Sequence, residues 1–200
     1  ICTWHGTHPS LTIASADAGV QGILCEKPMA VNLEDADAML AACGRSGTKL
    51  AIGHHHRFNA RNTEARRQIV GGAIGAPHML RLTVGGGLTN NGTHAIDGAR
   101  YLLGDPTAEW VIGQVEGDPF SDHEEPYDEA TTGFGGIGGT IRFENGIECF
   151  SSYADLGWRG IEVVGTEGVI DNGRVTGLGL TLRKAVEVQG GQRLLRPVGG

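Results

Sequence analysis

Residues 1–52 alternate short apolar runs with helical patterns, and this alternation constrains the fold more than any other feature of the sequence. Strands separated by helices at this pitch predict a parallel sheet with right-handed crossovers, and ligands bind such sheets beyond the carboxyl ends of the strands. We therefore expect functional groups at those ends. The predicted elements are the end of a strand at 1–3, a helix at 9–18, a strand at 22–25, a helix following Asn32 and a strand at 49–52.

The helix after Asn32 is predicted to bury one face. Asparagine is a strong N-cap residue because its side-chain oxygen accepts a hydrogen bond from a main-chain N–H. Apolar residues at i, i+3, i+4 and i+7 define the predicted face, and they are Ala36, Met39, Leu40 and Cys43.

The segment 87–105 joins a glycine-rich loop to a second distinctive helix, with Gly104 as its left-handed cap. Three polar residues lie where this helix begins: Asn90 and His94 are four apart, and His94 and Asp97 are three apart. A histidine here can exchange protons near neutral pH, whereas a capping or packing role for His94 is the alternative. The predicted buried face consists of Ile96, Ala99 and Leu103.

The sequence becomes β-rich from about residue 78, after a predicted helix at 60–70. We expect a mostly antiparallel sheet with one face packed against the helix that follows His94. Asn145-Gly146 is a strong hairpin signal, and the acidic stretch 116–129 indicates a solvated loop. Strands are predicted at 79–84, 110–115, 139–143, 147–153, 160–164, 169–170, 178–183 and 193–194.

Composition restricts the class of protein and partner. The chain is 40% apolar and 20% charged, which is typical of a soluble globular protein. A net charge of −7 without a basic run argues against nucleic-acid binding, and no apolar run is long enough to cross a membrane. Four cysteines lack the paired spacing of a zinc site or a disulfide framework and indicate reduced, mostly buried thiols. The arginines predicted to form one solvated helix face are Arg57, Arg61, Arg66 and Arg67.

Two other motifs resemble ligand sites, but we expect neither to be one. The glycines of 133–138 fit the pattern G-x-G-x-x-G, which binds a dinucleotide where it turns a strand into a helix; here it leads into a predicted strand. His54, His55 and His56 are consecutive. Because consecutive side chains of an extended segment point to opposite faces, we expect no metal site there.

The tripeptide Glu26-Lys27-Pro28 directly follows the predicted strand 22–25. A lysine at the carboxyl end of a parallel strand can donate to a substrate hydroxyl or hold a cofactor ribose. A surface lysine in a turn is the alternative interpretation when the tripeptide is taken alone. Pro28 is also a candidate for a cis peptide bond.

Taken in order, five segments resemble the Gfo/Idh/MocA oxidoreductases, the relatives of glucose–fructose oxidoreductase and inositol dehydrogenase. The segments are 1–3 followed by His8 and a helix, Cys25-Glu26-Lys27-Pro28, Gly53 to Phe58, the GGAIG of 71–75, and Gly92-Thr93-His94-Ala95-Ile96-Asp97. The resemblance is strong over the first half of the chain. In the second half it rests on the β-rich character and on residues 142–146.

The resemblance implies NAD or NADP as cofactor and hydride transfer at a carbinol carbon of a sugar, polyol or related compound. Lys27 would match the family lysine near nicotinamide and substrate, and His94 the general base. Asn90 stands where the family often has Asp, and its carbonyl oxygen can still orient an imidazole. The residues expected at the cofactor are Thr3, Trp4, His5, His8, Glu26, Lys27 and Pro28. The residues expected at the substrate are Arg57, Asn90, His94 and Asp97.

The resemblance also implies the domain organisation, an α/β fold class in two parts. Residues 1–58 would be the C-terminal part of a Rossmann domain with a parallel sheet. Residues 59–200 would be an α+β domain for substrate binding and dimerisation, with a large, mostly antiparallel open sheet, and we expect this domain to be incomplete at its C-terminus. We expect the glycine fingerprint for the dinucleotide upstream of Ile1, and a cytoplasmic homo-oligomer, a dimer or tetramer, that acts on a small sugar or polyol.

Two further functions stay open on the sequence. The first is a non-catalytic ligand-binding or regulatory protein of the same fold, which Asn90 favours because it replaces the family's charged residue. The second is an enzyme of this fold that cleaves glycosides by transient oxidation with NAD.

Overall fold

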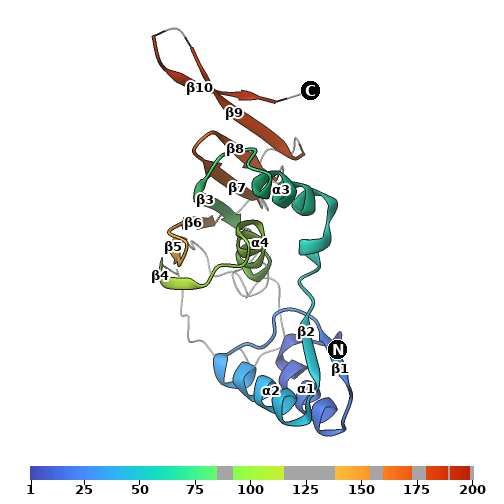
Figure 1. The fold of residues 1–200 in the computed structure, drawn as a ribbon. Helices are drawn as coiled ribbons and strands as arrows, with labels where there is room; N and C mark the ends of the chain where they lie inside the picture. The colour runs from blue at the N-terminus through green and yellow to red at the C-terminus, as the bar shows by residue number, and fades with distance from the viewer. Residues whose placement is uncertain (85–91, 115–137, 154–159, 173–178, 189, 199–200) are drawn as a thin grey trace. The chain divides into compact units, whose positions relative to one another are not determined.

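The computed structural model describes residues 1–84, 92–114, 138–153, 160–172, 179–188 and 190–198. The chain divides into two compact units, the first ending at His55 and the second beginning at His56 (Figure 1). Among the described helices, none has the length and apolar character needed to cross a bilayer.

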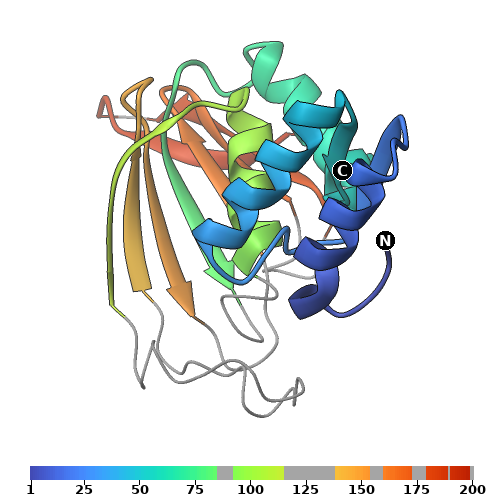
Figure 2. The ribbon, with the colours of Figure 1, turned by 90° about the horizontal axis from the view of Figure 1, so that it is seen from below.

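The first unit has the predicted alternation of strands and helices. Its strands β1 and β2 pair in parallel, with Gly22 opposite Lys49 and Cys25 opposite Ile52. Helices α1 and α2 pack against each other, and Figure 2 shows them side by side. The parallel Rossmann-type sheet expected here is therefore confirmed. The elements are η1(His5–Thr7), α1(His8–Asp17), β1(Gly22–Cys25), α2(Leu33–Ser46) and β2(Lys49–Ile52).

The strand expected at residues 1–3 is not formed, but Ile1 still pairs with β1. The main-chain nitrogen of Ile1 donates to the Leu24 carbonyl at 2.7 Å, and the Glu26 N–H donates to the Ile1 carbonyl at 3.0 Å. These two bonds are the pattern of a parallel bridge. Ile1 therefore lies on the side of β1 opposite to β2.

Helix α2 begins as predicted, but its apolar face differs in part from the predicted one. Asn32 caps it, since its side chain accepts from the Asp35 N–H at 2.8 Å, and Gly47 closes it in the left-handed conformation. Met39 and Cys43 are buried as expected. Leu40 is 55% exposed, whereas Ala42 is buried, so the prediction for Leu40 was wrong. The small Ala42 side chain lets the helix approach its neighbours closely.

The second unit is an eight-stranded sheet with two helices. The strand order is β10-β9-β8-β7-β3-β6-β5-β4, and every pairing is antiparallel except that of β3 with β6 among the described strands. The expected mostly antiparallel sheet is therefore confirmed. Its elements are η2(His55–Phe58), α3(Ala60–Val70), β3(Pro77–Val84), α4(Thr93–Leu103), β4(Ala108–Gln114), β5(Gly138–Phe143), β6(Glu148–Tyr153), β7(Gly160–Gly165), β8(Gly168–Asp171), β9(Thr181–Glu187) and β10(Arg193–Pro197).

One turn of this sheet follows its sequence signal, and one strand is displaced from its predicted position. Asn145-Gly146 joins β5 to β6 as predicted, with Gly146 at φ 81°. The strand expected at 178–183 is displaced, because β9 runs from Thr181 to Glu187. Gly138, the last glycine of the G-x-G-x-x-G pattern, begins strand β5. A dinucleotide-binding loop would lead into a helix instead. The rest of that glycine motif and the acidic stretch 116–129 lie outside the described residues.

Helix α4 packs on β3 and β7 and forms the centre of the core of this unit (Figures 1 and 2). Ala99 and Leu102 are fully buried, and Ile96 and Leu103 pack partly buried against the same core. A Cβ on Gly98 would lie 2.8 Å from the Cδ1 of Ile161, so glycine permits this close contact between helix and sheet. The predicted packing of the helix after His94 on the sheet is confirmed.

The cysteines are all free thiols, as expected. Cys2 is exposed, and Cys25, Cys43 and Cys149 are buried. Burial raises the pKa of the Cys149 thiol to about 12 and also raises that of Cys25. The thiols of Cys25 and Cys149 are therefore protonated at neutral pH and act as packing groups.

The turn between β7 and β8 is held by the segment that precedes β3. The Glu167 N–H donates to the Ile74 carbonyl at 2.9 Å, and the Thr166 N–H donates to the Ala76 carbonyl at 3.0 Å. A Cβ on Gly165 would overlap the carbonyl oxygen of Ile74, which is itself buried.

We predict that Gly165→Ala lowers the free energy of unfolding of the protein by about 1–3 kcal/mol, because main-chain atoms must move to admit the methyl group. The control is Gly113→Ala in β4, where the nearest atom lies 3.8 Å from an added Cβ. That change should stay within about 0.5 kcal/mol. Urea unfolding followed by circular dichroism measures both, and equal stabilities of the two variants would contradict the account of the turn.

Candidate functional site

The carboxyl ends of β1 and β2 carry polar groups at adjacent positions. Glu26 and Lys27 follow β1, and Gly53 follows β2. The Lys27 N–H donates to the Glu26 carboxylate at 3.3 Å, and the Lys27-Pro28 peptide bond is cis. A Cβ on Gly53 would lie 3.3 Å from Glu26 Oε2, so glycine leaves room at this edge of the sheet.

His8 connects two of the segments expected at the cofactor. Its ring is 1% exposed, and it lies between two main-chain carbonyls. Nδ1 is 2.8 Å from the Pro28 oxygen, and Nε2 is 3.0 Å from the Thr3 oxygen. The structure thus places His8 between these two segments, and its expected place at the cofactor stays a prediction.

The loop before α1 presents the other expected residues at the surface. Trp4 is 63% exposed, and its indole lies edge-on to the His5 ring with a centroid distance of 6.3 Å. The Thr7 hydroxyl donates to the Thr3 hydroxyl and also to the Trp4 carbonyl, each at 2.8 Å. These contacts fix the loop and leave the Trp4 side chain at the surface of this unit.

His94 lies in the first turn of α4 and is half-buried. Its imidazole stacks on that of His56, with centroids 4.0 Å apart and planes at 22°. Local sequence patterns do not indicate this pair, because the two residues are far apart in the chain. Asn90 lies outside the described residues, so its expected role beside His94 stays a prediction.

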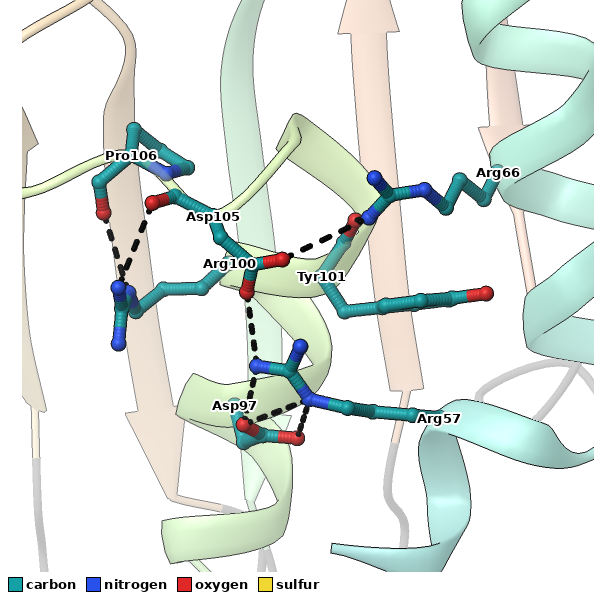
Figure 3. Close-up of polar contacts among 7 residues, drawn as sticks. All are labelled: Arg57, Arg66, Asp97, Arg100, Tyr101, Asp105 and Pro106. Atoms are coloured by element: carbon teal, nitrogen blue, oxygen red, sulfur yellow. Dashed lines mark hydrogen bonds and ion pairs between the residues drawn. The ribbon is translucent and has the colours of Figure 1, made fainter.

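Arg57 and Asp97, both expected at the substrate, bind each other (Figure 3). Arg57 Nε donates to both carboxylate oxygens of Asp97, at 2.8 and 3.0 Å, and Nη2 donates to Oδ1 at 2.6 Å. Nη2 also donates to Asp105 at 2.8 Å. Arg57 therefore connects η2 to α4, through Asp97, and to the residue just beyond the C-terminal cap of that helix.

Tyr101 and Arg66 complete this group, which we call the Arg57 cluster (Figure 3). The Arg57 and Arg66 guanidinium groups lie 5.5 and 4.5 Å from the centroid of the Tyr101 ring. Arg66 donates to the Tyr101 carbonyl and lies 3.8 Å from an Asp105 carboxylate oxygen. The cluster consists of Arg57, Arg66, Asp97, Tyr101 and Asp105.

The prediction of one solvated arginine face was therefore wrong for two of its members. Arg57 and Arg66 turn towards α4, with side-chain exposures of 24% and 31%. Arg67, at 73% exposure, fits the prediction and pairs with Glu64 on the same helix. Spacing places the arginines on a helix, but the carboxylates that they bind come from a distant segment.

The cluster perturbs the ionisation of its members. The hydrogen bond from Arg57 lowers the pKa of Asp105, and the positive charges of Arg57, Arg66 and Arg100 act in the same direction. The hydrogen bond to Asp97 raises the pKa of the Arg57 guanidinium, which stays charged throughout the physiological range.

Comparison with known proteins indicates the class of protein to which this chain is similar. The family model "Oxidoreductase family, NAD-binding Rossmann fold" (Gfo/Idh/MocA) matches residues 1–54. Among solved structures, an NAD binding oxidoreductase from Klebsiella pneumoniae superposes with a TM-score of 0.75 at 21% identity, over 99% of this chain and 59% of that one. An aldose-aldose oxidoreductase from Caulobacter crescentus gives 0.71 at 26% identity, over 98% and 62%. The fold is that of the NAD-binding oxidoreductases.

Curated relatives agree. Myo-inositol 2-dehydrogenase of Thermotoga maritima is 31% identical over 202 residues, which cover 90% of this chain and 58% of the relative. 1,5-anhydro-D-fructose reductase of Ensifer adhaerens is 31% identical over 194 residues, covering 84% and 54%. The chain thus spans a little over half the length of these relatives. Residues 1–54 match the Gfo/Idh/MocA family model, whose description is that of an NAD-binding Rossmann fold, and the chain is similar to these oxidoreductases over most of its length, which confirms the resemblance.

We predict that Asp105→Asn weakens the acid sensitivity of the second unit. The folded-state pKa of Asp105 is lowered, so its contribution to stability is present above about pH 4 and is lost as the pH falls through the folded-state pKa. Asparagine tolerates the positive φ of 62° at this position, so the exchange removes charge without backbone strain. Solvent screening limits the difference to about 1 kcal/mol or less.

Unfolding free energies of the two proteins, measured between neutral pH and about pH 3, test this. The variant should lose less stability over that interval than the wild type. In an Arg57→Gln background the same exchange should matter much less, because the hydrogen-bond donor is gone. Identical pH profiles for wild type and Asp105→Asn would refute the assignment.

Proposed function

We propose that the protein oxidises a CH–OH group of a sugar, polyol or related carbinol with NAD or NADP as hydride acceptor. The observation that supports this is the place of His94, a half-buried imidazole in the first turn of α4 that stacks on His56. The resemblance matches His94 with the family's general base. The names of the relatives, a myo-inositol dehydrogenase and an anhydrofructose reductase among them, support a polyhydroxylated substrate.

The first unit fits the cofactor. Glu26 is exposed and Lys27 half-buried at the carboxyl end of a parallel strand, where dinucleotides bind in such folds. Gly53 keeps the neighbouring strand end free of a side chain. We assign the cofactor contacts to Thr3, Trp4, His5, Glu26, Lys27 and Pro28.

A small number of groups carry out the proposed reaction. A bound nicotinamide would supply the acceptor for the hydride that leaves the carbinol carbon. His94 accepts the hydroxyl proton, which leaves a carbonyl product. The Lys27 ammonium stabilises negative charge on the reacting oxygen and orients the hydroxyl. Asn90 orients the His94 ring through its amide oxygen.

Arg57 and Asp97 act on the substrate indirectly, by fixing the position of α4. Their side chains bind each other, so we assign them to holding α4 in place while leaving the substrate contacts to other groups. Residues 59–200 would supply the substrate-binding part and the surface for a homo-oligomer. Trp110, Val111 and Ile112 of β4 are exposed apolar side chains that suit such a contact.

We predict that His94→Ala lowers kcat by about 100-fold or more while the KM for the cofactor stays the same, because a positioned base is lost and the dinucleotide segments are untouched. Reduction of NAD and NADP over a panel of polyols, including myo-inositol, and of aldoses measures this. The matched control is His78→Ala, which removes an exposed histidine from β3 and should have no effect.

Turnover of His94→Ala at the wild-type rate would exclude His94 as the base. Thermal stabilisation by a sugar without reduction of either cofactor would favour the non-catalytic binding protein. Release of a free sugar from a glycoside without net cofactor reduction would indicate the glycoside-cleaving relative.

A further inference from the structure

We propose that His56 is a positioning residue for the base, one that holds the plane of the His94 imidazole by stacking against it. The inference rests on the proposed role of His94. Centroids 4.0 Å apart and planes inclined by 22° place the two rings in van der Waals contact, face to face. A ring covered on one face has fewer orientations open to it, because rotation about its side-chain bonds would bring it into collision with its neighbour.

The stack is useful only if His56 is itself held, and its main chain is anchored to the core of the second unit. The side-chain amide of Asn62 donates to the His56 carbonyl at 3.0 Å. Asn62 is 5% exposed and accepts in turn from the Asn172 amide at 3.4 Å. Asn172 accepts from the Ile161 N–H of β7 at 3.1 Å. A buried relay of amides therefore joins η2 to the central part of the sheet.

His94, the other partner of the stack, lies on a helix that is held by the residue next to His56 in η2. Arg57, the residue after His56, makes its bidentate contact with Asp97, which lies three residues after His94 on α4. Side chains three apart on a helix are neighbours, so this contact fixes the turn that carries His94. His56 and Arg57 together thus hold the ring and the backbone of the base.

Orientation matters for this chemistry because proton transfer requires one ring nitrogen to face the hydroxyl at hydrogen-bond distance. Small misplacements of a reacting group cost up to about 100-fold in rate. A ring held in one plane before the substrate arrives keeps that nitrogen aimed. Phenylalanine at position 56 supplies the same flat face without a nitrogen, whereas alanine supplies none.

The experiment compares His56→Ala with His56→Phe and uses His78→Ala as the matched histidine control. We expect His56→Ala to lower kcat by between about 10- and 100-fold with the KM for the cofactor unchanged. His56→Phe should keep kcat near the wild-type value. Initial rates of cofactor reduction with a turned-over polyol provide both constants.

A second readout needs no turnover. Proton NMR of the free protein should show the ring C–H resonances of His94, assigned by their absence in His94→Ala, shifted upfield by the ring current of His56. His56→Phe should retain an upfield shift and His56→Ala should lose it.

The outcomes separate the two proposals. Wild-type kcat in His56→Ala, while His94→Ala is inactive, would overturn the positioning role and leave the proposed function intact. Wild-type kcat in His94→Ala would overturn the proposed function and the positioning role with it. An unchanged His94 resonance in His56→Ala would show that the stack does not exist and would overturn the inference alone.

Discussion

The bidentate ion pair between Arg57 and Asp97 is the interaction on which the second unit's candidate site depends. Three hydrogen bonds of 2.6–3.0 Å join one guanidinium to one carboxylate, and the two side chains are 24% and 13% exposed. Charge-assisted pairs with this geometry fix orientation as well as distance. Removal of one partner would leave the other charge partly buried, so the pair is stable only as a whole. It joins η2 to α4.

The sheet supplies the rigidity that this pair needs. Gly98 brings α4 close to Ile161 of β7, and Asn172 bonds the same Ile161 main chain while supporting Asn62. Helix α4 and, through the two asparagines, η2 are therefore both anchored to strand β7 of the core. A site built on two such supports holds its side chains more tightly than one built on loops alone.

Local patterns predicted the local structure well. Alternating apolar runs located β1, α2 and β2, the Asn32 cap fixed where α2 begins, and Asn145-Gly146 fixed the hairpin between β5 and β6. These features depend on residues close in sequence, so one sequence contains the whole signal. Leu40 shows where prediction from local patterns fails. Helical spacing is compatible with either of two neighbouring buried faces, and tertiary packing decides between them.

The contacts of the candidate site were harder to predict because they join distant segments. Arg57 was singled out as a substrate residue, but its partners are Asp97 of α4 and Asp105, which lies just beyond the C-terminal cap of that helix. His56 was noticed only as part of a histidine run, and its stacking on His94 depends on how η2 and α4 meet. His8 was expected at the cofactor, and its burial between two carbonyls follows from the close approach of residues 3 and 28. The order of the motifs along the chain was enough to indicate the family. The hydrogen-bond partners of each residue became known only from the three-dimensional structure.

The most direct test of the account is the substitution Arg57→Lys, because it keeps the positive charge and removes the planar bidentate geometry. The measurement is kcat for cofactor reduction together with the His94 ring resonances of the free protein. The account predicts displaced His94 resonances and a kcat at least about 10-fold lower, with helix content and cofactor KM unchanged. Wild-type kcat with unmoved His94 resonances would show that the ion pair does not position the base, and would contradict the account.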